Sequence, residues 1–426
     1  MDVDRLPAFL NDIAPATGVL ALVGGRVLDE LDRSGRANEP RTVLVRDGQI
    51  EAVIGVDDGV PDGATLEDVA GMTVLPGLID AHIHVSMLGD AGRGPEPAKG
   101  AEPIRPGVEA HLVARTLREL LAAGVTTIRD VGAHGDVLLA ARQAVRYGAF
   151  AAPRMLLSGR IVSATAPGAR FFPDMYREAD GPDDIRRAVR EQIRAGADFV
   201  KIMSTGARSV ELENPLPAQL TEAEMVAFVE EAQRLTYRTA AHCEGRDGAQ
   251  LAIAAGVDTI EHGFHLHERP ALLARMAERG TVLVPTLDFL HHVAESDAWT
   301  PELERQGIAN LEHAQRTLDA ARAAGVTLAA GSDGVTSDGL VRELGRFVEH
   351  GLSQAEALAA ATSGGAAALG LEAAVGSIRA GLRADLVVVE GSPLDDLAVL
   401  GRPEAITLVL HNGVRVGGAR AAAGRP

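Results

Sequence analysis

The sequence predicts an α/β protein, a (β/α)8 TIM barrel with a small β-sandwich built from the N- and C-terminal segments. Three observations lead to this prediction. From Pro76 to about Leu371, short apolar runs typical of strands alternate with amphipathic stretches typical of helices. Eight such apolar runs can be counted, which is the number that closes a barrel. Further strand-like runs lie outside this region, at both ends of the chain.

The length of the chain sets the expected domain organisation. With 426 residues it exceeds an ordinary single domain but suits one barrel and a smaller unit. Residues 1–75 hold strand-like runs separated by Gly and Asp turn signals, and residues 372–426 return to strands. Each segment is too small for a core of its own, so we expect the two to pair into a composite β-sandwich. Residues 76–371 then form the barrel.

The eight expected barrel strands follow one another along the middle of the chain. Helical stretches such as VEAHLVARTLRELLAAG and DDIRRAVREQIRAG separate them. Long insertions at residues 90–107 and 164–181 follow the first and third strands, and loops of this kind usually shape a substrate pocket. The strands read, in order, TVLPGLIDAHIHV, VTTIRDVG, PRMLLSG, ADFVKIM, RTAAHCEG, DTIEHG, TVLVPTL and VTLAAGSDG.

Charge and composition exclude several classes of partner. The formal net charge of −18 and the pI near 5.2 argue against nucleic acid and anionic membranes, because both attract basic surfaces. No uncharged apolar run reaches the length of a membrane span, and the N-terminus lacks the pattern of a signal peptide. The single cysteine, Cys243, rules out an intrachain disulfide and fits a reducing compartment. We therefore expect a cytoplasmic protein that acts on a small-molecule substrate.

Polar side chains stand at the C-terminal ends of several expected strands. A barrel keeps its chemistry at these ends, and a pair of divalent metals needs such a mixture of neutral imidazoles and anionic oxygens. The pattern therefore predicts a metallohydrolase with two divalent metal ions, for which Zn is our first expectation and Mn, Co or Fe are alternatives. The expected metal ligands are His82, His84, Lys201, His242, His262 and Asp333.

The His-x-His pair opens this set. On a strand, residues i and i+2 point to the same face, so His82 and His84 project together. Two parallel imidazoles supply half of a tetrahedral metal shell. Asp80, just upstream, is expected to orient one of the two rings as a hydrogen-bond acceptor. The alternative is a coincidental pair of core histidines.

Lys201 lies inside the apolar run FVKIM, where a charged ammonium is costly to bury. A neutral amine can add carbon dioxide and form a carbamate, an N6-carboxylysine that bridges two cations. The alternative is a lysine whose head reaches solvent or a carboxylate at the barrel mouth. His242 and His262 each end a separate strand and would complete the second metal's shell. Asp333 follows three small residues, and its carboxylate can both touch a metal and accept a proton.

At this point the chain resembles the amidohydrolase superfamily over nearly its whole length. The resemblance includes the entry VLPGLIDAHIHV, the spaced Lys, His, His and Asp, and the closing GLSQAEALAAATSGGAAALGL and GSIRAGLRADLVVVEGSPL. The segments TTIRDVG, REQIRAGADFVKIMSTG and VPTL are similar to the imidazolonepropionase-like group, which includes Xaa-Pro dipeptidases (prolidases). The resemblance implies that His82, His84 and Asp333 bind the buried metal. It further implies that carboxylated Lys201 bridges both metals.

The same resemblance implies that His242 and His262 bind the more exposed metal. In dipeptidases of this group, the position of His134 is expected to contact the substrate near the scissile carbonyl. Two departures concern the substrate. This chain has SATAPGARFF where related dipeptidases often carry a His-containing, Gly-rich stretch, and Leu220 where they often have an aromatic residue. Arg208 or Arg170 is a candidate for binding a substrate carboxylate.

The expected reaction is hydrolysis of an amide C–N bond by a hydroxide that bridges the two metals. Asp333 would take the proton of the attacking water and pass it to the leaving nitrogen. The expected substrate is a dipeptide, as for a prolidase, or an N-acyl amino acid. A cyclic amide or lactone hydrolase is the alternative, and a deaminase or a non-catalytic metal-binding barrel is less favoured. We expect the active form to be a homo-oligomer.

Overall fold

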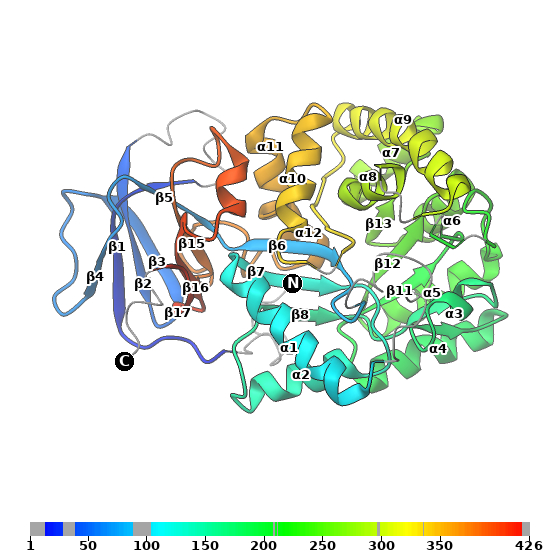
Figure 1. Cartoon of the computed structure of the whole chain (residues 1–426), viewed down its shortest axis with the longest axis horizontal. Helices are drawn as coiled ribbons and strands as arrows, with labels where there is room; N and C mark the ends of the chain where they lie inside the picture. Colours follow the sequence, from blue (N-terminus) through cyan, green and yellow to red (C-terminus); the bar gives the residue numbers. More distant parts are fainter. Residues whose placement is uncertain are drawn as a thin grey trace.

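A computed structural model describes residues 13–28, 39–87, 104–207, 209–210, 212–295, 299–334 and 336–419. Figure 1 shows a mixed α/β molecule in which a β-sheet domain lies beside a larger part where helices surround parallel strands. Within the described ranges, no helix combines the length and the apolar character that crossing a membrane requires.

Strands from both ends of the chain form the β-sheet domain. The strand order is β17-β16-β15-β5-β1-β2-β3, with β4 paired to β1, and β5 pairs antiparallel with β15. The two termini thus share one sheet, whereas two packed sheets and the domain limits at residues 75 and 372 stay predictions. The strands are β1 (Val19–Val27), β2 (Pro40–Arg46), β3 (Gln49–Gly55), β4 (Thr65–Asp68), β5 (Met72–Pro76), β15 (Leu386–Glu390), β16 (Ile406–His411) and β17 (Val414–Gly417).

Two-residue turns fix the register of this sheet. Asp47 and Gly48 join β2 to β3, and both have positive φ, of 49° and 80°. Asn412 and Gly413 join β16 to β17 in the same way, with φ of 49° and 73°. Asp-Gly and Asn-Gly favour the tight hairpin turns that need two left-handed residues in succession. The sequence therefore specifies both hairpins locally.

Parallel strands make up the larger part of the molecule. They form a three-stranded sheet, β6-β7-β8, and a six-stranded sheet, β10-β9-β11-β12-β13-β14, in which every pair is parallel. Every residue of β6 and β7 is buried, as expected when helices cover a parallel sheet. The strands are β6 (Leu78–Ile83), β7 (Val125–Asp130), β8 (Arg154–Leu157), β9 (Ile161–Ser163), β10 (Tyr176–Glu178), β11 (Phe199–Met203), β12 (Arg238–Cys243), β13 (Thr259–His262) and β14 (Val282–Val284).

The segment expected as the eighth strand, 326–334, forms no regular strand and makes one isolated parallel bridge, between Leu328 and Leu283. It still bonds on both sides, because Ala329 N donates to Leu283 O at 2.9 Å and Ala81 N donates to Ala330 O at 2.9 Å. The small residues of this segment let it run close to β6 without a regular ladder. Among the described residues the strands of this larger part therefore form two sheets rather than a closed barrel, and the (β/α)8 closure stays a prediction.

Helices follow most of the parallel strands. Helix α5 begins with a capping box, in which the Thr221 hydroxyl accepts from Glu224 N and the Glu224 carboxylate accepts from Thr221 N. Helix α4 ends at Gly196, whose φ of 109° lies in the left-handed region. The helices are α1 (Pro106–Ala122), α2 (Val137–Arg146), α3 (Gly168–Phe171), α4 (Pro182–Ala195), α5 (Glu222–Arg234), α6 (Arg246–Ala255), α7 (Pro270–Arg279), α8 (Leu287–Glu295), α9 (Pro301–Ala324), α10 (Gly339–Glu349), α11 (Gln354–Ala360) and α12 (Ser363–Leu369), with short 3-10 turns η5 (Leu266–Glu268) and η6 (Leu397–Gly401).

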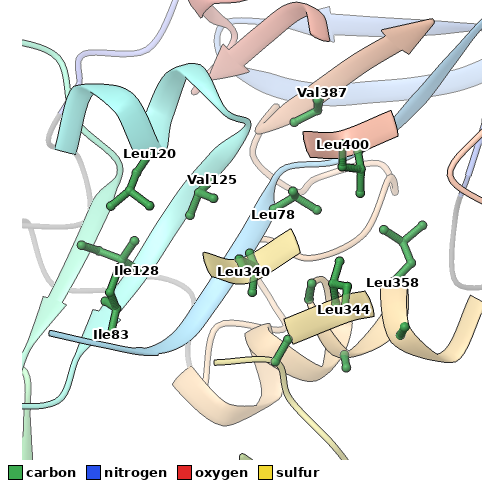
Figure 2. Close-up of a cluster of buried hydrophobic side chains, with 14 of the residues drawn as sticks. Leu78, Ile83, Leu120, Val125, Ile128, Leu340, Leu344, Leu358, Val387 and Leu400 are labelled. Atoms are coloured by element: carbon green, nitrogen blue, oxygen red, sulfur yellow. The ribbon is translucent and has the colours of Figure 1, made fainter. Parts of the chain in front are cut away.

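The main apolar core fixes β6, the strand that carries the His-x-His pair. Figure 2 shows Leu78 and Ile83 of β6 among side chains of β7 and of helices α10 and α11. Val387 of the β-sheet domain and Leu400 of η6 belong to the same buried cluster. Each fully buried aliphatic side chain contributes about 1.5–3 kcal/mol relative to leaving it exposed. The core therefore holds the end of β6 in place and joins the two parts of the chain.

Candidate metal centre

All six expected ligands line one pocket at the ends of the parallel strands. Lys201 is on β11, while His242 and His262 are on β12 and β13. The pocket has a volume of about 70 Å³. Its lining includes each member of the expected set, His82, His84, Lys201, His242, His262 and Asp333. Residues as far apart in the sequence as His82 and Asp333 thus meet at one place.

The donors of three residues converge closely enough to share one ion. The Nε2 atoms of His82 and His84 lie 3.3 and 3.5 Å from Oδ1 of Asp333. One ligand atom from each residue lies within 4.8 Å of the others. Two donors bound to a tetrahedral Zn²⁺ at about 2.0–2.1 Å are about 3.4 Å apart. The residues present therefore fit a divalent cation held by His82, His84 and Asp333.

Hydrogen bonds on the opposite ring nitrogens orient the histidines. Nδ1 of His82 lies 2.7 Å from Oε2 of Glu261, and Nδ1 of His84 lies 2.9 Å from the Gly132 carbonyl oxygen. A ring that donates from Nδ1 presents the lone pair of Nε2, and this is how metal-binding histidines are normally held. Burial lowers the pKa of His84 to about 4, so its ring is neutral at pH 7.

Glu261 is the member of this centre that the sequence reasoning missed. It is fully buried, and Nη2 of Arg129 donates to both of its oxygens, at 2.8 and 2.9 Å. Burial raises the pKa of the Glu261 carboxyl, but the charges of Arg129 and Lys201 outweigh this and keep it well below its usual value. Glu261 is therefore an anion that fixes His82. The signal in the sequence was an ionisable residue inside the expected strand DTIEHG.

Asp80 has a different partner from the one expected. Its Oδ1 accepts from the backbone N–H groups of His82 and Ser332, at 3.1 Å each, and not from an imidazole. The side chain that orients the His82 ring is Glu261 instead. Burial raises the pKa of Asp80 to about 6. Asp80 therefore ties β6 to the segment that carries Asp333, which positions the donors without touching them.

Three residues in or next to the pocket have a strained backbone conformation. His262, Thr286 and Asp333 have φ values of 68°, 51° and 47°. Left-handed backbone costs a non-glycine residue about 1–3 kcal/mol and is concentrated at functional sites. Nδ1 of His262 lies 2.7 Å from the Thr286 hydroxyl, and Asp333 N donates to the His82 carbonyl at 2.8 Å. These bonds hold the strained residues in the conformation that aims them at the pocket.

Lys201 and His242 complete the polar side of the pocket. Lys201 is only 2% exposed, and burial lowers the pKa of its amine to about 8. Nε2 of His242 lies 3.1 Å from the Gly206 carbonyl oxygen, and its ring centre lies 4.5 Å from that of His262. A buried amine of reduced basicity beside two imidazoles is chemically suited to carbamate formation, which remains a prediction here.

An apolar wall faces these groups. We define it by the pocket-lining residues Met87, Ile161, Phe172, Met175, Met203, Phe289 and Trp299. The insertion at residues 164–181 supplies Phe172 and Met175, in line with the expectation that it shapes a pocket. The insertion at residues 90–107 lies mostly outside the described residues. Trp299, packed edge-on against Phe289 at 6.0 Å, had no signal in the sequence.

His134 and Arg170, two of the three expected substrate contacts, are not among the described pocket-lining residues. Nδ1 of His134 lies 3.7 Å from Oε1 of Glu109, and His134 is not among the described pocket-lining residues. Arg170 is exposed on α3, and Arg208 lies outside the described residues. Leu220 packs in the buried core around β11 and β12 and does not line the pocket in the described structure. The roles expected of His134, Arg170 and Arg208 stay predictions.

A parallel α/β fold with histidine and aspartate donors in one pocket is typical of metal-dependent hydrolytic enzymes. The sequence model of the amidohydrolase family matches residues 73–416. The chain belongs to the amidohydrolase family. The expected superfamily and the expected hydrolytic activity are thereby confirmed.

Named relatives agree with this assignment. The chain is 29% identical to ochratoxinase of Aspergillus niger over 404 residues, covering 87% of this chain and 82% of that protein. It is 28% identical to imidazolonepropionase of Salinispora arenicola over 396 residues, covering 87% and 91%. It also superimposes on the crystal structure of a Xaa-Pro dipeptidase with bound methionine in the active site. That match has a TM-score of 0.82 and 27% identity, and it covers 93% of this chain and 99% of the other.

Proposed function

We propose that this protein is a dinuclear metal-dependent amidohydrolase that cleaves the amide C–N bond of a dipeptide or an N-acyl amino acid. The observation that carries the proposal is the meeting of six potential ligands in one pocket, His82, His84, Lys201, His242, His262 and Asp333. A structural zinc site is normally closed by Cys and His, whereas this set contains no Cys and shares its pocket with apolar side chains.

The proposal includes a division of labour among the ligands. His82, His84 and Asp333 would hold one metal, and His242 and His262 would hold the other, with Lys201 as N6-carboxylysine between them. Imidazole and carboxylate donors suit Zn²⁺, which is the ion we propose. When bound, two divalent cations polarise an amide carbonyl and lower the pKa of a water between them.

The chain's own residues would supply the remaining chemistry. Asp333 would accept the proton of the attacking water and return it to the departing amide nitrogen. The hydrogen bond from Asp333 N to His82 O keeps that carboxylate next to the histidine pair. Glu261 holds the His82 ring in one tautomer throughout. The apolar wall excludes bulk water, which strengthens every electrostatic interaction inside the pocket.

The apolar wall also supports a substrate with a large apolar group. Aromatic and methionine side chains supply contact area without a charge requirement, and Met adapts to irregular shapes. The similarity to a protein named as a Xaa-Pro dipeptidase supports a dipeptide substrate. We therefore place the apolar part of the dipeptide or acyl group against Phe289 and Trp299.

Further parts of the proposal concern architecture and location. The backbone bonds of Ala329 and Ala330 to neighbouring strands support a closed (β/α)8 barrel, and the pairing of β5 with β15 supports a composite β-sandwich. The single cysteine, Cys243, supports a reducing, cytoplasmic environment. We also propose that the active form is a homo-oligomer.

Elemental analysis of the purified protein, run beside hydrolysis of a dipeptide and N-acyl amino acid library, tests the proposal. We expect two pocket metals per chain, counted as those that Lys201→Ala loses, together with amide turnover that this variant also loses. Lys99→Ala, which removes the other lysine of the chain, should keep both. Two metals without amide turnover would direct the search to cyclic amides and lactones. One metal or none would exclude the bridging role of Lys201 and favour a deaminase.

A further inference from the structure

A second group of potential metal ligands lies outside the pocket, where η5 meets α9. His265 and Glu268 at η5 and His313 on α9 have donor atoms within 4.8 Å of one another, and Nε2 of His267 lies 3.4 Å from Nδ1 of His313. We call these four residues the η5–α9 cluster. None of its members is among the pocket-lining residues. We propose that the η5–α9 cluster binds a divalent transition metal of the Zn²⁺ type, independently of the metals in the pocket.

The distances within the cluster match those of a coordination shell. Oε1 of Glu268 lies 2.9 Å from Nδ1 of His265 and 3.8 Å from Nδ1 of His313. Nδ1 of His313 lies 3.4 Å from Nε2 of His267. Donors on a tetrahedral ion with bonds of about 2.0–2.1 Å lie about 3.4 Å apart, which is within the range of these three separations. Small shifts of two partly exposed side chains, Glu268 and His313, would equalise them.

A hydroxyl group sets the tautomer of His267. The Thr317 hydroxyl donates its one hydrogen to the Phe264 carbonyl at 2.7 Å. Its oxygen must therefore accept from Nδ1–H of His267, 3.1 Å away, and this leaves the lone pair of Nε2 directed at His313. A ligand ring that donates its other N–H to a neighbouring oxygen is the usual arrangement around bound metals.

An amide group orients His265 in a corresponding way. Nε2 of His265 lies 3.2 Å from Oδ1 of Asn310, so the ring turns Nδ1 toward Glu268. Nη1 of Arg246 lies 2.6 Å from Oε2 of Glu268, so one carboxylate oxygen is held by a cation while Oε1 faces the imidazoles. The donors that lie within 4.8 Å of one another are thus two imidazoles and one carboxylate, and the His267 ring adjoins them at His313. Borderline-soft ions such as Zn²⁺ favour imidazole and carboxylate donors.

The position of the cluster gives the ion a structural consequence. The side chains of Glu268 and His313 are 27% and 33% exposed, which leaves a path for an ion from solvent. An ion bound there would link η5, which begins four residues after His262, to α9. Figure 1 shows α9 alongside α7 in the same region. The metal would therefore anchor the loop that follows β13 to the long helix beside it.

Cobalt titration of the metal-free full-length protein tests this inference. Tetrahedral Co²⁺ absorbs visible light strongly, so bound ions can be counted and their geometry assigned. We expect His313→Gln and Glu268→Gln each to bind one Co²⁺ per chain fewer than the unmodified protein. His111→Gln, which removes an exposed histidine from α1, is the matched control and should bind the full number.

Variants of the pocket separate this inference from the proposed function. Lys201→Ala should keep the Co²⁺ equivalent that His313→Gln loses, whatever its effect on turnover. Equal Co²⁺ numbers in the unmodified protein, His313→Gln and Glu268→Gln would overturn the inference and leave a hydrogen-bonded group of imidazoles. Because the side chains of Glu268 and His313 are partly exposed, we expect both variants to fold. Circular dichroism verifies this. His267→Gln provides a third, independent removal of a ligand.

Discussion

Nδ1 of His82 and Oε2 of Glu261 lie 2.7 Å apart in the interior, although the two residues are separated by 179 positions in the sequence. The contact joins β6 to β13 across the centre of the parallel strands. Glu261 in turn binds Arg129 of β7, so three strands meet in one buried network of charge. The candidate metal ligand His82 is thus held by the carboxylate of Glu261, and the guanidinium of Arg129 balances the charge of that carboxylate.

Substitution of Glu261 by Gln should weaken metal binding without removing a ligand. The amide keeps the shape of the side chain but lowers the basicity that the carboxylate confers on the His82 ring. Loss of such a partner typically lowers metal affinity by about 10–100-fold. Competition with a chromogenic chelator measures this directly, together with kcat at saturating metal.

The matched control for Glu261→Gln is Glu231→Gln. Glu231 is also buried and also bonds two arginines, Arg190 and Arg234, but it lies on α5 away from the pocket. Both variants should lose stability, while metal affinity should fall only in Glu261→Gln. Equal metal affinity in the two variants would show that Glu261 serves only to balance the charge of Arg129.

Much of the candidate site could be predicted from the sequence because its members sit at the ends of apolar runs. A polar residue after several buried positions, as at His82, His242 or His262, is unusual enough to be noticed. The partners of those residues could not be found in this way. Arg129 and Glu261 meet only because β7 and β13 converge, and no local pattern connects them.

Most of the fold could also be predicted from the apolar runs of the sequence. Seven of the eight expected strands coincide with strands of the structure, since Val- and Ile-rich runs favour them. The eighth, around Ala329 and Gly331, differs because small residues impose no strand preference and the segment follows its neighbours instead. Trp299 reached the pocket unnoticed, since a lone aromatic residue between helices has no periodic pattern.

Carboxylation of Lys201 should depend on pH in a defined direction. Only the neutral amine reacts with carbon dioxide, and burial lowers the pKa of Lys201 to about 8. At a fixed concentration of dissolved carbon dioxide, the neutral amine adds CO₂ and releases one proton to the solvent. The initial rate of carbamate formation in the metal-free protein should therefore rise steeply from pH 6 to pH 8 and level off above about pH 9. Carbon-13 NMR after labelling with ¹³CO₂ measures the carbamate signal.

The chain offers a clean control for this experiment because it has only two lysines, Lys99 and Lys201. Lys201→Arg keeps the positive charge but cannot be carboxylated, so the signal should disappear. Lys99→Arg should retain it. A carbamate signal that persists in Lys201→Arg would assign the modification to another amine and remove the bridging role of Lys201.

Substitution of Trp299 by Ala should affect large apolar substrates selectively. Losing about 50–100 Å² of apolar contact at about 25 cal/mol per Å² costs about 1.3–2.5 kcal/mol, or about 10–70-fold in kcat/KM. Substrates that carry a methyl group at the same position should change little. Tyr147→Ala removes an aromatic side chain that is 82% exposed and should leave both substrates unaffected. An equal loss for large and small substrates would place the apolar group elsewhere in the pocket.

The buried ion pair between Arg154 and Asp385 joins the parallel strands to the β-sheet domain. Of the buried pairs that make such a connection, we expect it to be the most costly to break. Nη1 of Arg154, on β8, lies 2.5 Å from Oδ2 of Asp385, next to β15, and both side chains are almost fully buried. Asp385→Asn leaves the guanidinium without its counter-charge, and breaking a buried pair in this way costs about 3–5 kcal/mol. Urea denaturation at pH 7 should show this loss in the free energy of unfolding. The exposed pair of Arg46 and Glu51 provides the control, since Glu51→Gln should cost less than about 1 kcal/mol.

The effect of Asp385→Asn should also shrink in acid. Burial raises the pKa of Asp385, but the charge of Arg154 outweighs it and holds the pKa below the usual value. A carboxyl with a lowered pKa stabilises the folded state above its unfolded pKa of about 3.9, and this contribution is lost as the pH falls through the folded value. The difference in unfolding free energy between the unmodified protein and the variant should therefore be constant from pH 5 to pH 8 and narrow below about pH 4. A difference that stays constant down to pH 3 would mean that charge does not stabilise the pair, and that Asp385 acts only as an acceptor for Asn412 N at 2.8 Å.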